Sequence, residues 1–383
     1  MDERVQLIGD YLRGNASITQ LSQAYGISRK TVYKWIERYE QAGAAGLEER
    51  SRAPYSHPNA TAFEIVEELT RARLSHPRWG PKKLVAYLEQ HQADLAWPAP
   101  STAGDILKRA GLVVERKRKH RAPAYAQPLR EPYQPNDVWS ADFKGQFRTR
   151  DARMCYPLTI TDNASRYPLL SRGLRHPSFE ESRPWFEWTF RQYGLPAAIR
   201  TDNGAPFGST GLGGLSRLGV WLMRLGIRPE RIAPGHPEQN GRHERFHRTL
   251  KEATAQPPKQ DLPEQQRAFD EFLLEFRHER PSEALGQRTP ASIYRPSPRP
   301  YPQSLPEISY EHEEGLVRHV RHNGQIRLAG NLFYVSEALA GEPVLLVPLA
   351  NHLWQVKYSF YALANLDASS RTILPLPRLP FDC

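Results

Sequence analysis

Three carboxylates stand out because of the residues around them. Asp142 lies in the middle of an expected strand with apolar neighbours, where a charged side chain must face a site or find a partner. Asp202 ends a second expected strand and is followed by Asn203-Gly204, which predicts a turn at the edge of a sheet. Glu244 lies in an expected helix. Most acidic residues are surface charge, so composition alone does not single out any of the three.

Carboxylates without cysteine beside them are typical ligands of hard divalent cations such as Mg²⁺ or Mn²⁺. Two such ions, about 3.5–4 Å apart, can activate a water or a hydroxyl and neutralise the leaving oxygen of a phosphodiester. This chemistry requires that one sheet edge brings the three distant segments together. The acidic residues therefore predict a magnesium or manganese site, provided that the fold makes them converge.

The segment PEQNGRHERFHRTLK (residues 237–251) predicts a helix beyond Gly241, with Phe246 and Leu250 turned inward. Its polar face is expected to hold Asn240, Glu244, His247 and Lys251. Three histidines flank the acid, namely His236, His243 and His247. Because a carboxylate site needs no imidazole, we favour helix surface or hydrogen bonds to phosphate over metal ligation for them. Lys251 is expected to contact a phosphate of DNA.

Residues 136–298 are expected to form a mixed α/β sheet. The expected strands cover 138–143, 158–162, 165–170 and 197–201, and an expected helix covers 185–193. Consecutive strands followed by an alternation of strand and helix are typical of such a sheet. The first strand alternates as a half-buried strand does. Within this region, Arg166 and Arg200 fit a structural role as well as a phosphate contact.

Residues 1–50 predict a helix-turn-helix domain. Ser17 and Gln20 form an expected capping box, Gly26 ends the first helix, and Ser28 caps the second. The second helix has an inner stripe of Val32, Trp35, Ile36 and Tyr39. The residues expected to contact DNA are Ser28, Arg29, Lys30, Tyr33 and Lys34. Basic residues in the first turns of the second helix favour a DNA reader over a plain helical hairpin.

Residues 58–114 predict a second domain of three short helices. Pro81 suits the first turn of its second helix, Ser101 is expected to cap the third, and Gly111 to close it. Its basic face carries Lys82, Lys83, Lys108 and Arg109, for which DNA binding and a solvated surface fit equally.

The following linker, residues 115–135, is basic and rich in proline. It is expected to be extended. Its cations can contact phosphate while the segment serves as a linker; they are Arg116, Lys117, Arg118, Lys119 and Arg121.

Residues 305–383 predict a small β-barrel. Asn323-Gly324 is a strong hairpin signal between the expected strands 317–322 and 325–328. Further strands are expected at 344–347 and 354–358. Such a barrel could bind DNA or protein, and the sequence does not choose between them.

Composition narrows the class of protein. The chain has 383 residues with 52 Lys+Arg and 42 Asp+Glu, a net charge of +10. The surplus favours polyanionic partners through counterion release. With 39% apolar residues the chain can form real cores, which excludes wholesale disorder. Because there is no apolar run of ~18 residues, no signal-peptide pattern and only two cysteines, we expect a soluble, cytoplasmic protein without a membrane partner.

Three motifs resemble the acidic motifs of the DDE transposase and retroviral-integrase superfamily: WSADFKG, RTDNGAPF and GHPEQNGRHERFHRTLK. The closer likeness is to bacterial insertion-sequence transposases, whose core ends in a segment similar to RPSEALGQRTPASIY (residues 280–294). The resemblance implies an α/β RNase H-like catalytic core behind N-terminal all-α helix-turn-helix domains. It also implies that Asp142, Asp202 and Glu244 are the catalytic and metal-ligating triad, with two ions of Mg²⁺ or Mn²⁺.

The third acid requires a choice between two glutamates. The family's usual spacing of thirty-five residues after Asp202 points to Glu238, whereas forty-one residues separate Asp202 from Glu244. We choose Glu244 because the family's acid follows the motif glycine by three residues, as Glu244 follows Gly241. The glycine-rich stretch 210–214 can absorb the difference as a loop.

The implied activity is transposition. Such a protein binds the terminal inverted repeats of a mobile element as double-stranded DNA, hydrolyses a phosphodiester at the element's end, and transfers the freed hydroxyl into target DNA. It acts as a homo-oligomer, at least a dimer, because two ends must be joined, and it is nucleoid-associated in a bacterium. One alternative is a DNA-binding repressor or catalytically inactive derivative. Another is a nuclease for RNA–DNA hybrids, which the helix-turn-helix units disfavour because such helices read B-form duplex.

Overall fold

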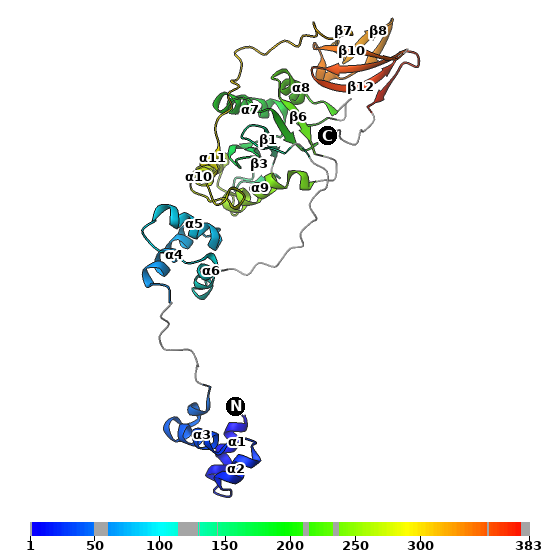
Figure 1. Cartoon of the computed structure of the whole chain (residues 1–383). Coiled ribbons are helices and arrows are strands. Elements are labelled where there is room, and N and C mark those ends of the chain that lie inside the picture. The colour runs from blue at the N-terminus through cyan, green and yellow to red at the C-terminus, as the bar shows by residue number, and fades with distance from the viewer. Residues whose placement is uncertain are drawn as a thin grey trace. The chain divides into compact units, whose positions relative to one another are not determined.

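The computed structural model describes residues 2–49, 60–113, 129, 131–143, 145–209, 214–232, 237–350 and 352–376. The chain divides into two compact units, residues 1–62 and residues 63–383, and Figure 1 shows their helices and strands. None of the described helices combines the length and the apolarity needed to span a lipid bilayer.

The N-terminal unit is a bundle of α1 (Asp2–Leu12), α2 (Ile18–Ala24) and α3 (Arg29–Ala42), followed by the 3-10 turn η1 (Gly43–Leu47). The expected capping box at Ser17 is confirmed, and so is the Ser28 cap, whose hydroxyl accepts from the Thr31 amide at 3.1 Å. The inner stripe is confirmed as well, because Val32, Trp35 and Ile36 are buried. The sequence patterns missed α1, whose Leu7 and Ile8 complete this core.

The second unit begins with α4 (Phe63–Ser75), α5 (Pro81–His91) and α6 (Pro100–Arg109). Pro81 occupies the first turn of α5 as expected. The expected Ser101 cap is wrong, because α6 begins at Pro100 and Ala99 is its N-cap without a side-chain hydrogen bond. Proline fixes the helical φ angle at the first position and lacks the amide hydrogen that a cap would satisfy.

The central sheet consists of β1 (Val138–Phe143), β3 (Met154–Asp162), β4 (Pro168–Leu174), β5 (Ala198–Thr201) and β6 (Arg228–Arg231). Their order across the sheet is β4-β3-β1-β5-β6, and the short β2 (Phe147–Arg148) also pairs with β3. β3 runs antiparallel to β1 and β4, whereas β5 is parallel to β1 and to β6. The expected mixed α/β sheet is therefore confirmed.

Helices cover both faces of this sheet (Figure 1). On one face, α7 (Phe179–Tyr193) and α8 (Arg217–Arg224) pack against β1 and β3 in an apolar core. On the other face lie α9 (Gly241–Thr254) and α10 (Leu262–His278), with Cys155 of β3 in their core. The sequence predicted a half-buried first strand, but the first four residues of β1 are all buried because both faces are covered. After α10, the 3-10 turn η4 (Glu283–Leu285) and the short α11 (Pro290–Ile293) follow, and the Tyr294 hydroxyl donates to Asn136 Oδ1 at 3.0 Å.

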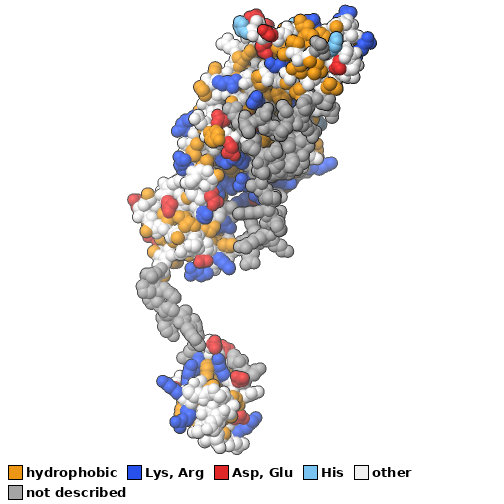
Figure 2. All heavy atoms as spheres, turned by 45° about the vertical axis from the view of Figure 1, so that its right-hand side comes forward, with side chains coloured by type: hydrophobic (Ala, Val, Ile, Leu, Met, Phe, Trp, Pro, Cys, Tyr) orange, Lys and Arg blue, Asp and Glu red, His pale blue; other side chains and the backbone are white. Residues whose placement is uncertain are grey.

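The C-terminal region is all β. One antiparallel sheet has the order β13-β12-β11-β10-β7, and a second contains β8 and β9. The strands are β7 (Leu316–His319), β8 (Gln325–Leu328), β9 (Asn331–Tyr334), β10 (Pro343–Ala350), β11 (Leu353–Tyr358), β12 (Tyr361–Asp367) and β13 (Thr372–Pro375). The two sheets share a core. Apolar side chains also lie on the outer surface here (Figure 2). Leu332 and Tyr334 of β9 are both exposed.

The predicted barrel and hairpin need correction. The Asn323-Gly324 turn is present, since the Gly324 amide donates to the Arg321 carbonyl at 2.9 Å. However, β8 pairs with β9 and β7 pairs with β10, so the two strands that flank this turn belong to different sheets. Within the described part of the chain, no strand ladder closes the two sheets into a barrel. A local turn signal does not specify which distant strand completes each ladder.

Candidate functional site

The register of the sheet places Asp142 and Asp202 at neighbouring positions. β1 and β5 are parallel, and Ser140 pairs with Arg200. Side chains on a strand return to the same face every second residue. Asp142 lies two residues beyond Ser140 near the end of β1, and Asp202 lies two residues beyond Arg200, directly after the end of β5. The register therefore brings the two aspartates to the same edge of the sheet, and both are half-buried. Asp202 Oδ1 also accepts a hydrogen bond from the Gly204 amide at 3.1 Å.

Helix α9 lies against the face of the sheet that carries Asp142. The Nδ1 atom of His247 is 3.6 Å from Asp142 Oδ2. His243 and His247 are each only 1% exposed, so the expectation that they lie on the helix surface is wrong. They face the polar side of β3, where Thr159 is directly opposite Asp142 in the β1–β3 ladder.

Two threonines hold these histidines. Thr159 Oγ1 lies 2.8 Å from His243 Nε2 and 2.5 Å from His247 Nε2, and it donates to the Asp142 carbonyl oxygen at 3.2 Å. Thr161 Oγ1 lies 2.8 Å from His243 Nδ1. A hydroxyl has one hydrogen and two lone pairs, so three partners exhaust Thr159. The sequence patterns missed both threonines, although their alternation with Leu158 and Ile160 was a usable signal.

The same contacts test whether the histidines fit a metal ion. Ligand atoms of Asp142, His243 and His247 lie within 4.8 Å of one another. Both ring nitrogens of His243, however, are hydrogen-bonded to threonine hydroxyls, and ligation would require breaking one of these buried bonds. The carboxylate oxygens of Asp142 and Asp202 are instead the hard donors that Mg²⁺ or Mn²⁺ prefers. The histidines pack α9 against β3, and the carboxylates have the donor chemistry that these ions prefer.

Glu244 lies on the exposed side of α9, one residue from His243 and three from His247. Lys251 is exposed on the same helix, but Asn240 and His247 are buried, so the four residues do not form one polar face as expected. His236 and the side chain of Glu238 lie outside the described residues.

The basic residues predicted to contact DNA have different surroundings. Arg29, Lys30, Tyr33 and Lys34 are exposed on α3. Lys82 forms an ion pair with Glu283 at 3.0 Å, Lys83 donates to the Pro281 carbonyl, and Lys108 is exposed on α6. Outside the described residues lie Arg116, Lys117, Arg118, Lys119 and Arg121, as does most of the glycine-rich stretch 210–214.

Arg200 is structural. It is buried, and its Nη2 lies 3.0 Å from Glu230 Oε2 on the neighbouring strand β6. Its register partner on β6 is the same Glu230, so this ion pair ties together the two strands that follow β1 across the sheet.

Comparison with known proteins finds matches to four families along the chain. Residues 3–55 match the family described as a helix-turn-helix domain, and residues 31–107 match a homeodomain-like domain. Residues 132–237 and residues 225–290 match two families that are both described as integrase core domain.

Among the relatives, an uncharacterized 39.2 kDa protein of the insertion element IS476 from Xanthomonas euvesicatoria is 28% identical over 248 residues, which are 62% of this chain and 65% of the relative. The transposase for transposon Tn552 from Staphylococcus aureus is 22% identical over 152 residues, 37% of this chain and 30% of the relative. The chain thus spans less than two thirds of the length of both. The HTLV-2 integrase catalytic core, solved in complex with magnesium, is 16% identical with a TM-score of 0.35, over 43% of this chain and 100% of the other.

Helix-turn-helix domains followed by an integrase core define the class of protein. The chain is thus similar to the product of an insertion element and to a transposase, in addition to its matches with helix-turn-helix and integrase core families.

Proposed function

We propose that this protein is a DNA transposase that binds the terminal inverted repeats of a mobile element and catalyses metal-dependent cleavage and strand transfer into target DNA. The register of β1 and β5 carries the proposal, because Asp142 near the end of β1 and Asp202 directly after β5 each lie two residues beyond the Ser140–Arg200 pair. The contact of His247 with Asp142 supports it, because it holds the helix of Glu244 against that face.

In this proposal, Asp142, Asp202 and Glu244 hold two ions of Mg²⁺ or Mn²⁺. Divalent ions held there supply the charge that activates the attacking oxygen and stabilises the leaving oxygen of a phosphodiester. In the first step, a water oxygen bonds to phosphorus while the bond to the strand-end oxygen breaks, which frees a hydroxyl. In the second, that hydroxyl bonds to a target phosphorus, and the target strand leaves with the proton.

The chain's own residues do the positioning. Asp142 lies on β1, Asp202 directly follows β5, and the third carboxylate comes from α9, which the buried histidines tie to β3. Sites on packed strands and helices keep their geometry better than sites on loops. Thr159 helps to position both Asp142 and α9, since its hydroxyl contacts the Asp142 carbonyl oxygen and both histidines.

DNA binding is assigned to α3 first. Arg29, Lys30 and Lys34 are exposed on its surface, and the second helix of a helix-turn-helix enters the major groove with its N-terminal residues. Lys108, Lys251 and the basic linker are proposed as further phosphate contacts. Because two element ends must be joined, the acting form is proposed to be at least a dimer of this chain.

A strand-joining assay tests the proposed function. The full chain is incubated with Mg²⁺, target DNA and duplexes that carry the inverted repeats flanking its gene. We expect joined products that depend on the divalent ion and do not form in EDTA. Binding to the repeats without joining in any divalent ion contradicts the proposal and favours a repressor.

The third acid is tested in the same assay by comparing Glu244→Gln with Glu238→Gln. We expect the first substitution to abolish joining and the second to leave it near the wild-type rate, because Glu244 shares α9 with His247. Loss of joining in Glu238→Gln alone assigns the third position to Glu238. Repeat binding by both variants is measured in parallel, and we expect it to be unchanged.

A further inference from the structure

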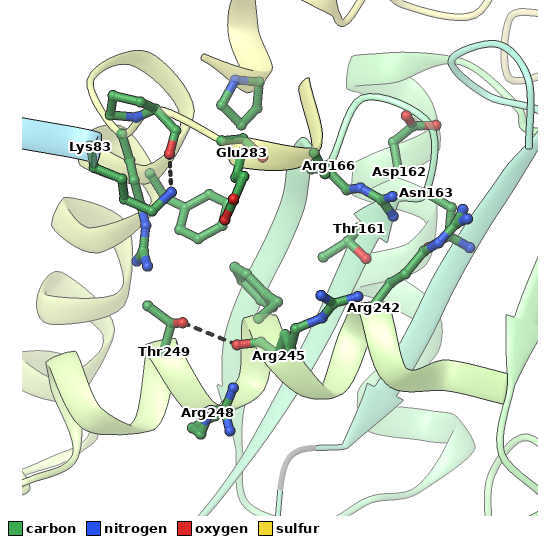
Figure 3. Close-up of a pocket in the computed structure, with 17 residues that line it drawn as sticks. Lys83, Thr161, Asp162, Asn163, Arg166, Arg242, Arg245, Arg248, Thr249 and Glu283 are labelled. Atoms are coloured by element: carbon green, nitrogen blue, oxygen red, sulfur yellow. Dashed lines mark hydrogen bonds between the residues drawn. The ribbon is translucent and has the colours of Figure 1, made fainter. Parts of the chain in front are cut away.

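A basic cavity lies beside the candidate metal site. It has a volume of about 290 Å³ and is bounded by the end of β3, by α9, and by the chain that follows α10. Figure 3 shows Arg166, Arg242 and Arg245 around Thr161 at one end of this cavity. Thr161 lies two residues along β3 from Thr159, the partner of Asp142, a separation of about 7 Å along the strand.

The positive charge in this cavity is poorly balanced. Six cationic side chains line it: Lys83, Arg166, Arg242, Arg245, Arg248 and Arg280. The acidic side chains among its lining residues are Asp162 and Glu283. Asp162 accepts hydrogen bonds from the amides of Asn136 and Ser165 and from the Ser165 hydroxyl, and Glu283 pairs with Lys82. Asp162 and Glu283 also act electrostatically on Arg166 and Lys83, and Arg242 pairs with Glu131 at 3.8 Å. Even so, the six cations outnumber these three carboxylates.

Arg166 shows the deficit most directly. Its Nη1 atom is buried and has no hydrogen-bond partner within the described residues. A buried donor without a partner is destabilising, and more so when it is charged. Burial lowers the pKa of Arg166 to about 10, with the charges of Arg242 and Arg245 adding to the effect.

Two further cations of the cavity are perturbed in the same direction. Burial lowers the pKa of Lys83 to about 8, and the charge of Arg280 lowers it further. Burial also lowers the pKa of Arg280. A negative group in the cavity would stabilise the charged form of all three and supply the acceptor that Arg166 lacks.

We propose that this cavity binds a phosphate group of the DNA backbone, held by Arg166, Arg242 and Arg245. Planar guanidinium groups match the geometry of phosphate oxygens, which favours arginine at such sites. The cavity volume of about 290 Å³ is several times the roughly 30 Å³ that one water molecule occupies. The cavity is therefore large enough for a phosphate group. The inference rests on the proposed function in taking DNA as the polyanion. Its consequence is that one DNA strand is bound about two residues along β3 from the candidate metal site.

The salt dependence of DNA binding tests this proposal without any catalysis. Binding of the full chain to a duplex of arbitrary sequence is measured in EDTA over a series of NaCl concentrations. For each phosphate contact, the slope of log K against log salt is about −0.9. We expect the double variant Arg166→Gln/Arg245→Gln to have a slope shallower by about 0.9. Arg245 is exposed, so we expect the single variant Arg245→Gln to keep the fold. It should bind DNA more weakly and show part of the change in the salt-dependence slope.

Two controls sharpen the result. Arg228→Gln removes an exposed arginine of β6 outside the cavity, and its slope is expected to match the wild type. Arg245→Lys keeps the charge and is expected to restore most of the slope. An unchanged slope in the double variant overturns the proposal.

A second measurement separates DNA from free phosphate. Thermal unfolding is followed in inorganic phosphate and in chloride at equal ionic strength, since a ligand of the folded state raises the midpoint. Protection by phosphate that the double variant loses, together with an unchanged DNA slope, assigns the cavity to small anions and overturns its DNA role. The two proposals can fail separately. If the double variant shows the shallower slope but the wild type does not join ends in Mg²⁺, DNA binding by the cavity is supported and the proposed transposase activity is contradicted.

Discussion

The two faces of the central sheet are built from the same strands and are stabilised differently. Toward α7 and α8, β1 and β3 present the apolar side chains of Trp139, Ala141, Leu158 and Ile160. Toward α9, the intervening residues are Ser140, Asp142, Thr159 and Thr161. One face gains stability from burial of apolar area. The other is held by directional hydrogen bonds, which fix distances.

This difference shows where a precise site can be built. Buried polar groups are tolerated only when they are hydrogen-bonded, so the polar face has few alternative arrangements. Ser140 bonds Asn163, while Thr159 and Thr161 bond the histidines of α9. Asp142 is the member of this layer at the strand end. The apolar face supplies the stability, and the polar face sets the geometry of the carboxylates.

The largest effect is expected on the polar face from Asp142→Asn. Asparagine has the same shape but no negative charge, so it removes a metal ligand without leaving a cavity. Groups that merely support a metal ligand already contribute about 10–100-fold, and we expect strand joining to fall by more than that. Joining is measured with Mg²⁺, and binding to the inverted repeats is the control, expected to stay at the wild-type level. Retained joining would remove Asp142 from the site.

The next effect concerns the apolar face and is one of stability. Phe190 of α7 is completely buried in the core beneath β1. Phe190→Ala is expected to lower the free energy of unfolding by about 3–5 kcal/mol, as large-to-small changes in cores do. Urea denaturation followed by fluorescence checks this. Trp188→Ala on the same helix is the matched control, because Trp188 is 42% exposed, and its effect is expected to be much smaller.

The same contrast explains what could be predicted from the sequence. The strand at 138–143 and the helix beyond Gly241 follow from local patterns, and both are found at those positions. The alternation of Thr159 and Thr161 with apolar residues is also a local sequence pattern, and it predicts a polar face on this strand. The burial of His243 and His247 was not predictable, because it depends on which helix packs on that face. The pairing of β7 with β10 was not predictable for the same reason, since the two strands are distant in the sequence.

The smallest effect is expected from Thr159→Val. This one substitution on the polar face is tested for both stability and strand joining. Valine has nearly the shape of threonine, so packing is preserved, but Nε2 of His243 and Nε2 of His247 each lose the hydroxyl that they contact. Leaving a buried polar group unsatisfied costs about 1–3 kcal/mol. We expect a loss of that size in urea denaturation, together with slower joining because α9 is less firmly held.

Ser171→Ala of β4 provides the matched control for this loss. The Ser171 hydroxyl is also buried in the sheet, but it has no hydrogen-bond partner among the described residues. Its removal is therefore expected not to lower the free energy of unfolding and to leave the joining rate unchanged. Equal losses in Thr159→Val and Ser171→Ala would mean that any buried hydroxyl of the sheet stabilises it to the same extent. The threonine–histidine contacts would then not be what fixes α9 against Asp142.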